Sequence, residues 1–154
     1  MQKQLEIRYA ELPQSDLSAG DSELLDAARG AALRAYAPYS HFRVGAAVRL
    51  ANGVVVEGNN QENIAYPSGL CAERTALFAA SAAHPGVPVE ALAVIAIAPD
   101  GQYAAALPCG ACRQVLSEYE SLHHKPIRTI AYCSEQCVRL FDSVADLLPF
   151  AFNM

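Results

Sequence analysis

Residues 91–98, Ala-Leu-Ala-Val-Ile-Ala-Ile-Ala, form the longest apolar run in the chain and decide the interpretation of the fold. The run is long enough for a strand that is buried on both faces, and far too short to cross a bilayer. Helical patterns at residues 71–83 and 108–119 lie on either side of it. Crossovers from strand to helix to strand predict parallel central strands. The sequence therefore predicts an α/β fold.

Further elements lie on both sides of this strand. Four more strands are expected, at residues 44–50, 54–58, 126–133 and 136–141. The Asn-Gly pair at residues 52–53 favours a tight hairpin turn between the first two. A helix is expected to be capped by Asp21 or Ser22 and to end before Pro38, and a short final helix is expected to be capped by Ser143. The apolar positions of the first helix share one face: Leu24, Leu25, Ala28, Ala31, Ala32 and Ala35.

Length and composition exclude several classes of protein. The 154 residues suit a single domain, and 53% of them are hydrophobic, which argues against disorder. The net charge of −5 disfavours a nucleic-acid partner and suits a small, weakly charged substrate. Residues 1–20 lack the apolar stretch of an export signal, so we expect a cytoplasmic protein with no membrane partner. In that compartment the five cysteines are expected to be free for metal binding or catalysis.

Two short motifs place three thiols and one carboxylate at the starts of two expected helices. They are Cys71-Ala72-Glu73 and Pro108-Cys109-Gly110-Ala111-Cys112. Cys109 and Cys112 are three positions apart, so their sulfurs lie on one side of a helical turn and can meet one metal ion. With Cys71 they predict a zinc site, one Zn²⁺ per subunit, whose fourth position is open to water, as in catalytic sites. Zinc deaminases show this pattern with a His in the place of Cys71, and their acid and base is a Glu that is not a ligand, here Glu73.

A site with three thiolates needs compensation of its charge. Three thiolates leave the zinc cluster formally at minus one, whereas two thiolates and an imidazole leave it neutral, and an electron-rich zinc acidifies water poorly. The positive ends of the two helix dipoles, Arg74 and Arg113 are the candidates for compensation. We expect Arg74, one turn from Cys71, to supply most of it.

Other interpretations of these residues stay open. The cysteines could form part of a structural zinc ribbon or be buried thiols, and Glu73 could be a solvated residue in a helix start. A zinc-stabilised binding module without turnover would need a fourth protein ligand. The four histidines are better explained as surface residues, since they show no ligand spacing: His41, His84, His123 and His124. Cys133 and Cys137 could suggest a second metal site but are more simply explained as core residues.

Taken together, the motifs resemble those of the small, homotetrameric cytidine deaminases that bind zinc through three cysteines. The resemblance runs from about residue 24 to residue 152. It is carried by Tyr36-Ala37-Pro38-Tyr39-Ser40, Asn60-x-Glu62-Asn63, Cys71-Ala72-Glu73-Arg74-Thr75, Pro108-Cys109-Gly110-Ala111-Cys112-Arg113-Gln114 and Leu147-Leu148-Pro149. It implies a three-layer α/β/α sandwich around a five-stranded mixed sheet. Residues 21–154 would form the deaminase domain, and residues 1–20 an N-terminal extension.

The resemblance also implies an activity and an assembly. The activity is zinc-dependent deamination of cytidine and 2′-deoxycytidine to uridine and 2′-deoxyuridine, a reaction of pyrimidine salvage, in a homotetramer. A polynucleotide or a cytosine-bearing antibiotic is the alternative substrate, although a deaminase of either should lack the sugar-binding pair Asn60 and Glu62.

Five residues would contact the substrate. Asn60 and Glu62 resemble the pair that binds the sugar hydroxyls, Phe42 the aromatic residue that packs on the pyrimidine, and the backbone of Ala72 a group that reads the base. Phe152 occupies the place of a Phe that completes the pocket of a neighbouring subunit, with Phe150 as its local competitor. From the residues alone, Asn60 and Glu62 could be solvated loop residues and Phe42 a core residue.

Overall fold

The structure, a computed structural model, describes residues 1–152. Within these residues the strands are β1 (Ala10–Leu12), β2 (Arg43–Leu50), β3 (Val55–Asn59), β4 (Val89–Ile97), β5 (Tyr103–Ala104), β6 (Arg128–Ser134) and β7 (Cys137–Phe141). The helices are α1 (Ala19–Ala32), α2 (Ala72–Ala83) and α3 (Gly110–His123), with 3-10 turns at Gln14–Asp16, Tyr66–Ser68 and Val144–Asp146. No helix among these residues is both long and apolar enough to cross a membrane.

The strands form one mixed sheet in the order β1-β7-β6-β4-β2-β3, with β5 paired to β4. β4 and β6 are parallel, which confirms the predicted parallel central strands for this pair, joined through α3. The strands joined through α2, β3 and β4, are parallel as well, but they are not neighbours in the sheet. The β2–β3 hairpin places β2 between them, antiparallel to both, so β3 and β4 point the same way without pairing.

The expected sandwich is confirmed, but the expected number of five strands is wrong, since residues 1–152 form seven. All five predicted strands are present, as β2, β3, β4, β6 and β7. The two additional strands are β1, which pairs with β7 through three residue pairs, and β5, which folds back on the end of β4 through two. Strands this short carry no alternating pattern that could reveal them.

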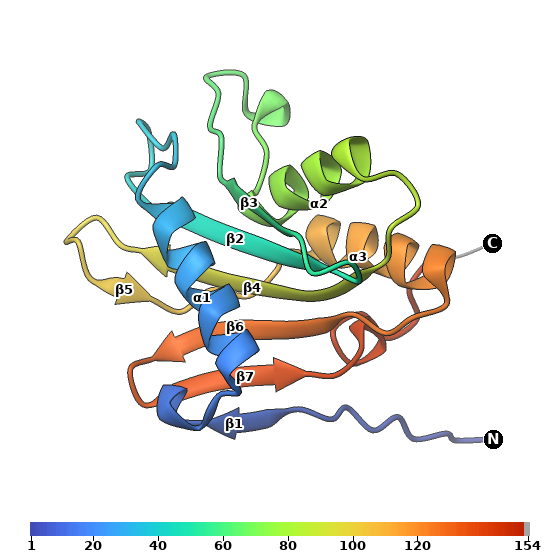
Figure 1. The fold of residues 1–154 in the computed structure, drawn as a ribbon. Helices are drawn as coiled ribbons and strands as arrows, with labels where there is room; N and C mark the ends of the chain where they lie inside the picture. Colours follow the sequence, from blue (N-terminus) through green and yellow to red (C-terminus); the bar gives the residue numbers. More distant parts are fainter. Residues whose placement is uncertain (153–154) are drawn as a thin grey trace.

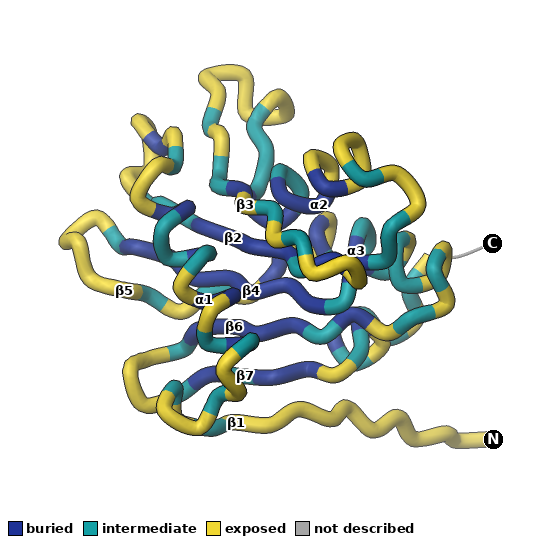
Figure 2. The backbone as a smooth tube through the Cα atoms, viewed as in Figure 1, coloured by how far each residue is buried: buried dark blue, intermediate teal, exposed yellow. Residues whose placement is uncertain are grey.

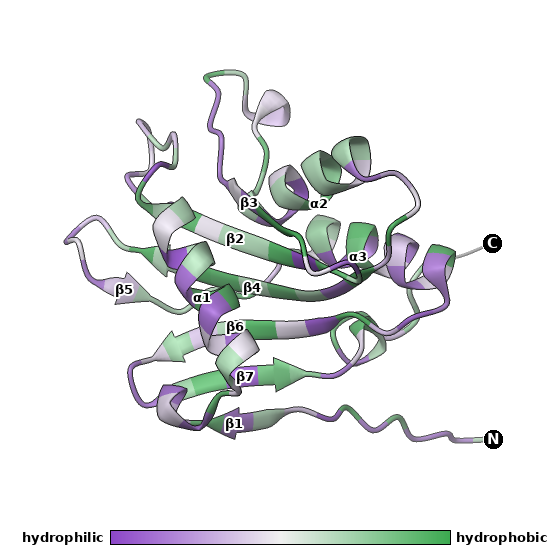
Figure 3. Cartoon of the chain, viewed as in Figure 1, coloured by the Kyte–Doolittle hydropathy of each residue, from purple (hydrophilic) through white to green (hydrophobic). Residues whose placement is uncertain are grey.

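Helices cover both faces of the sheet. α1 lies against one face, and α2 and α3 lie together against the other (Figure 1). Each face has its own cluster of buried apolar residues, and the central strands between them are buried along most of their length (Figure 2). Hydrophobic residues dominate these strands, whereas hydrophilic residues recur along the exposed N-terminal segment (Figure 3).

Two glycines let the helices approach the sheet closely. A Cβ atom on Gly45 in β2 would lie 2.0 Å from the Ala28 carbonyl oxygen in α1. A Cβ atom on Gly58 in β3 would lie 2.4 Å from the Ala76 backbone nitrogen in α2. Because backbone atoms fill both spaces, a larger residue would push the helix away. Gly58 therefore fixes the distance of α2, and of the residues in its first turn, from the sheet.

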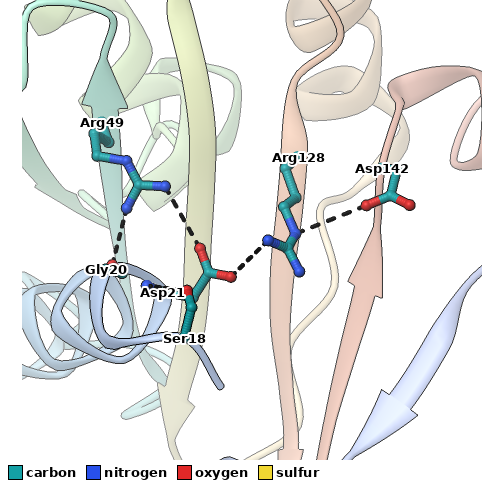
Figure 4. A network of polar contacts seen from close by, with 6 residues as sticks. All are labelled: Ser18, Gly20, Asp21, Arg49, Arg128 and Asp142. Carbon is teal, nitrogen blue, oxygen red and sulfur yellow. Dashed lines mark hydrogen bonds and ion pairs between the residues drawn. The ribbon is translucent and has the colours of Figure 1, made fainter. Parts of the chain in front are cut away.

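The first helix starts earlier than predicted. Its cap is Ser18, whose hydroxyl accepts a hydrogen bond from the Asp21 backbone N–H at 3.2 Å, and neither Asp21 nor Ser22 is the cap. The Asp21 carboxylate, 1% exposed, instead pairs with Arg49 at 3.5 Å and Arg128 at 2.7 Å, and Arg128 reaches Asp142 at 3.8 Å (Figure 4). This network ties α1 to strands β2 and β6.

The cap at Ser143 is confirmed, since its hydroxyl accepts from the Ala145 backbone N–H at 3.2 Å.

Candidate active site

Three cysteine sulfurs converge where α2 and α3 begin. Cys71 is the N-cap of α2, Cys109 is the N-cap of α3, and Cys112 lies in the first turn of α3. The Sγ atoms of Cys71 and Cys109 are 3.8 Å apart, and those of Cys109 and Cys112 are 3.5 Å apart. Within residues 1–152 these sulfurs are the one group of three or more potential ligands gathered within 4.8 Å. The structure thus brings together the cysteines that the sequence singled out.

The spacing of the sulfurs fits zinc. A tetrahedral ion with bonds of about 2.3 Å to sulfur holds its sulfurs about 3.8 Å apart, close to the observed distances. The neighbouring Cys112 thiol, followed by the Arg74 guanidinium, lowers the pKa of Cys71 to about 5, while its hydrogen bond to Cys71 raises the pKa of Cys112. Binding of a metal ion requires thiolates, so a cation that binds here displaces the remaining thiol protons. The positive ends of two helices add to the stabilisation of thiolates here.

Two arginines beside the cysteines have different surroundings. The Arg74 Nη2 atom lies 3.6 Å from the Cys71 sulfur. Arg113 instead donates to two backbone carbonyls, those of Pro108 and Leu147, both at 2.7 Å. Arg113 therefore anchors the chain that precedes α3 and the C-terminal segment. Of the two, Arg74 is the one whose charge faces a sulfur.

Glu73 lies in the first turn of α2, two residues after Cys71, and is only 4% exposed. Burial, with a smaller contribution from the Cys71 thiolate, raises the pKa of Glu73 to about 7. A carboxyl group with a pKa near neutrality can both accept and return a proton. The arrangement suits an acid and base that stays free of the metal.

A cavity of about 500 Å³ opens beside Cys71 and Arg74. Asn60 and Glu62 contribute to its lining, together with Tyr39, Ser40 and Tyr66. The volume suits a small molecule. The structure therefore places the two predicted sugar-binding residues and one predicted zinc ligand around the same cavity.

Other predicted substrate contacts do not line this cavity. Phe42 is half-buried, and Ala72 is buried at the start of α2, where backbone N–H groups have no partner within the helix. Phe152 is 77% exposed, and its carbonyl accepts a hydrogen bond from the Gln114 side chain at 2.9 Å. Phe150 is 94% exposed. Within one chain, the described residues leave both C-terminal phenylalanines outside the cavity.

Tyr39, Ser40 and Tyr66 are among the residues that line the cavity and to which sequence reasoning assigned no role. The first two belong to the motif at residues 36–40, which was the available signal for them. Tyr66 gave no signal of its own. Cys133 and Cys137 lie away from the zinc ligands, on the β6–β7 hairpin, and both are half-buried.

Residues 18–124 match the family model described as the cytidine and deoxycytidylate deaminase zinc-binding region. The match spans all three cysteines and Glu73. The chain belongs to this deaminase family.

Individual members of the family are similar over most of the chain. The cytidine deaminase of Mycobacterium tuberculosis is 40% identical over 127 residues, which cover 80% of this chain and 83% of the relative. That of Halalkalibacterium halodurans is 41% identical over 120 residues, covering 77% and 83%. The crystal structure of the cytidine deaminase from Burkholderia pseudomallei is 42% identical, with a TM-score of 0.72 and coverage of 84% of this chain and 97% of that one.

Proposed function

We propose that this chain catalyses the zinc-dependent hydrolytic deamination of free cytidine and 2′-deoxycytidine, which gives uridine and 2′-deoxyuridine plus ammonia. The observation that carries the proposal is the group of three sulfurs at the spacing of zinc ligands, with Cys71 on the wall of a cavity that suits a small molecule. Relatives at about 40% identity named cytidine deaminase support the substrate.

Zinc held by Cys71, Cys109 and Cys112 would supply an activated water near neutral pH. Arg74, 3.6 Å from the Cys71 sulfur, offsets the negative charge of the three thiolates. This positive charge favours hydroxide over water as the nucleophile. Arg113 has no such part, because its guanidinium is bound to carbonyls.

Glu73 carries the protons of the reaction. Its carboxylate accepts a proton from the attacking water and delivers it to N3 of cytosine, which makes C4 more electrophilic. The water oxygen bonds to C4 and stays there as a hydroxyl. Glu73 then accepts the proton of that hydroxyl and passes it to the exocyclic amine, whose bond to C4 breaks. The nitrogen leaves as ammonia, and C4 keeps the oxygen as a carbonyl.

The remaining contacts select a nucleoside. Asn60 and Glu62 bind the sugar hydroxyls, and the backbone of Ala72 binds the base. Phe42 packs against the pyrimidine ring. In a homotetramer, Phe152 of a neighbouring chain closes the cavity, for which the large exposure of this side chain is the support. Residues 21–154 form the deaminase domain, residues 1–20 form an extension, and the enzyme acts in the cytoplasm in pyrimidine salvage.

The experiment is to incubate purified protein with cytidine, cytidine monophosphate and a cytosine-containing oligonucleotide, and to follow the release of ammonia with and without a zinc chelator. We expect release from cytidine, its loss on chelation and its return on addition of zinc. Release from the oligonucleotide alone would overturn the substrate assignment. Zinc binding without release from any of the three would favour a binding module.

A further inference from the structure

One hydroxyl joins the two segments that face the cavity. Ser40 Oγ donates a hydrogen bond to Glu62 Oε1 and accepts one from the Phe42 backbone N–H at 3.0 Å. The backbone N–H groups of Tyr39 and Ser40 donate to the other oxygen, Glu62 Oε2, at 2.9 and 3.2 Å. Three donors from residues 39–40 therefore hold the Glu62 carboxylate.

These bonds leave little freedom to the carboxylate or to the hydroxyl. A carboxylate offers about four acceptor positions, so three filled positions leave about one for a ligand. A serine hydroxyl has a single proton, and the Phe42 N–H occupies the oxygen of Ser40 from the opposite side. The proton of Ser40 is thereby directed to Glu62. The hydrogen bond from Ser40 is also the main cause that lowers the pKa of Glu62 and keeps it an acceptor.

Asn60 holds the residues that follow Ser40 through two further hydrogen bonds. The Asn60 Oδ1 atom accepts from the Val44 backbone N–H at 2.7 Å, and its Nδ2 donates to the Phe42 carbonyl at 2.9 Å. Phe42 is thus held at its N–H by Ser40 and at its carbonyl by Asn60. His41, between Ser40 and Phe42, has a φ of 54°, a left-handed conformation that is uncommon for a residue other than glycine. The bond from Phe42 to Ser40 spans this residue and holds the turn.

We infer that Ser40 is a positioning residue for the substrate sugar, whose hydroxyl orients the one free acceptor of Glu62 toward the sugar hydroxyls. This inference rests on the proposed function, in which Glu62 binds the sugar. Ser40 itself need not touch the substrate. It acts before binding, because a carboxylate that is already oriented loses little conformational freedom when the nucleoside arrives.

The test compares Ser40→Ala with the parent enzyme on cytidine and on 2′,3′-dideoxycytidine, which lacks both hydroxyls that the pair would bind. Loss of a hydrogen bond to a charged group should raise KM for cytidine about tenfold while kcat stays within about twofold. For the dideoxy substrate, KM should change by less than about threefold, since the contact that Ser40 supports is absent. Ser121→Ala, at an exposed position late in α3, is the matched control and should change neither.

Two further variants separate positioning from a structural effect. In a Glu62→Ala background, Ser40→Ala should add less than about twofold to KM, because its effect passes through the missing carboxylate. Ser40→Thr keeps the hydroxyl and should restore KM for cytidine to within about threefold. If Ser40→Ala is unstable, Ser40→Cys takes its place, because Cys is similar in size and is a weaker donor. Ser40→Cys should likewise raise KM for cytidine more than KM for the dideoxy substrate.

The outcomes distinguish this inference from the proposed function. Equal increases in KM for the two substrates, additive effects with Glu62→Ala, or an unchanged KM for cytidine would each overturn the role of Ser40 while deamination by the parent enzyme stands. Absence of ammonia release by the zinc-loaded parent enzyme from either nucleoside would overturn the proposed function, and the inference with it.

Discussion

The two faces of the sheet each bury one acidic side chain, and the two acids have opposite surroundings. Asp21, on the α1 face, forms ion pairs with Arg49 and Arg128. Glu73, on the face of α2 and α3, forms no ion pair within residues 1–152, and burial raises its pKa to about 7. A buried acid with two partners is compatible with a purely structural role, whereas a buried acid without one costs stability and marks a functional site.

The same division holds for the helix starts on the two faces. The first turn of α1 is capped by a serine and carries the acid of the ion network. The first turns of α2 and α3 are capped by cysteines whose side chains make no capping bond and point their sulfurs at each other. The helix start on the α1 face therefore serves stability alone, whereas the helix starts on the other face position the groups that do the chemistry. Variants on the two faces should separate these two properties.

Glu73→Gln should give the largest effect. The amide cannot carry protons between water and base, so we expect turnover of cytidine to fall by about a thousandfold or more, within the range of general acid and base catalysis. Zinc content should remain at one ion per chain, because Glu73 is not a ligand. Ammonia release and metal analysis on the same sample check both statements. Activity close to that of the parent would remove Glu73 from the mechanism.

Gly58→Ala and Gly45→Ala form a matched pair across the sheet. Both added methyl groups meet helix backbone, at 2.4 Å for Gly58 and 2.0 Å for Gly45, so each variant should lose about 2 to 3 kcal/mol of unfolding free energy. Only Gly58→Ala displaces α2 and the ligand Cys71, and an error of about 1 Å in such a site costs about a hundredfold in kcat/KM. Gly45→Ala should keep kcat/KM within about threefold. Denaturant unfolding and steady-state kinetics measure the two effects, and equal kinetic losses would contradict the division.

Asp21→Asn should reduce stability without affecting chemistry. Breaking a buried ion pair costs about 3 to 5 kcal/mol, and because Arg49 and Arg128 are partly exposed we expect about 2 kcal/mol here. The kcat for cytidine should stay within about twofold at 25 °C, since the network lies on the opposite face from the cysteines. A variant as stable as the parent, or one with impaired zinc binding, would argue against this role of the network.

Removal of residues 1–13 should have the smallest effect. It deletes β1, with its three residue pairs to β7 and the 2.6 Å ion pair between Glu11 and Arg139, so we expect a loss of about 1 to 2 kcal/mol. Activity and zinc content should not change, which would support the assignment of residues 1–20 as an extension. Thermal unfolding of the truncated chain makes the comparison. A loss of turnover would place the N-terminal segment within the functional domain.

The main elements could be predicted because each carries a strong local pattern. The buried run at residues 91–98 became β4, and the apolar face of the first helix packs against the sheet as expected. The errors have local causes. β1 and β5 are too short to show a period, and the true cap, Ser18, lies before the apolar pattern that suggested Asp21 or Ser22. β2, the first strand of the predicted hairpin, lies between β3 and β4. The local pattern predicts the hairpin but not which of its two strands pairs with β4.

The candidate site also has some features that local patterns predict and others that depend on the tertiary structure. The spacing of Cys109 and Cys112 fixes their geometry locally, and Cys71 with Glu73 follows from a second helix start, so all four could be found in the sequence. The hydrogen bond from Ser40 to Glu62 joins residues 22 positions apart, so it depends on the tertiary arrangement of two loops. The sequence already favoured Arg74 over Arg113, and the structure adds that Arg113 is bound to two backbone carbonyls while Arg74 lies beside a cysteine sulfur. Neither Phe42 nor Phe152 lines the cavity within residues 1–152, so their proposed contacts rest on the resemblance alone.

The central claim is that three sulfurs hold zinc and leave its fourth position to solvent. X-ray absorption at the zinc edge of the purified protein tests it most directly. We expect one zinc per chain with three sulfurs at about 2.3 Å and one oxygen at about 2.0 Å. A shell of four sulfurs, the scattering of an imidazole ring in the fourth position, or a protein that retains no zinc would contradict it.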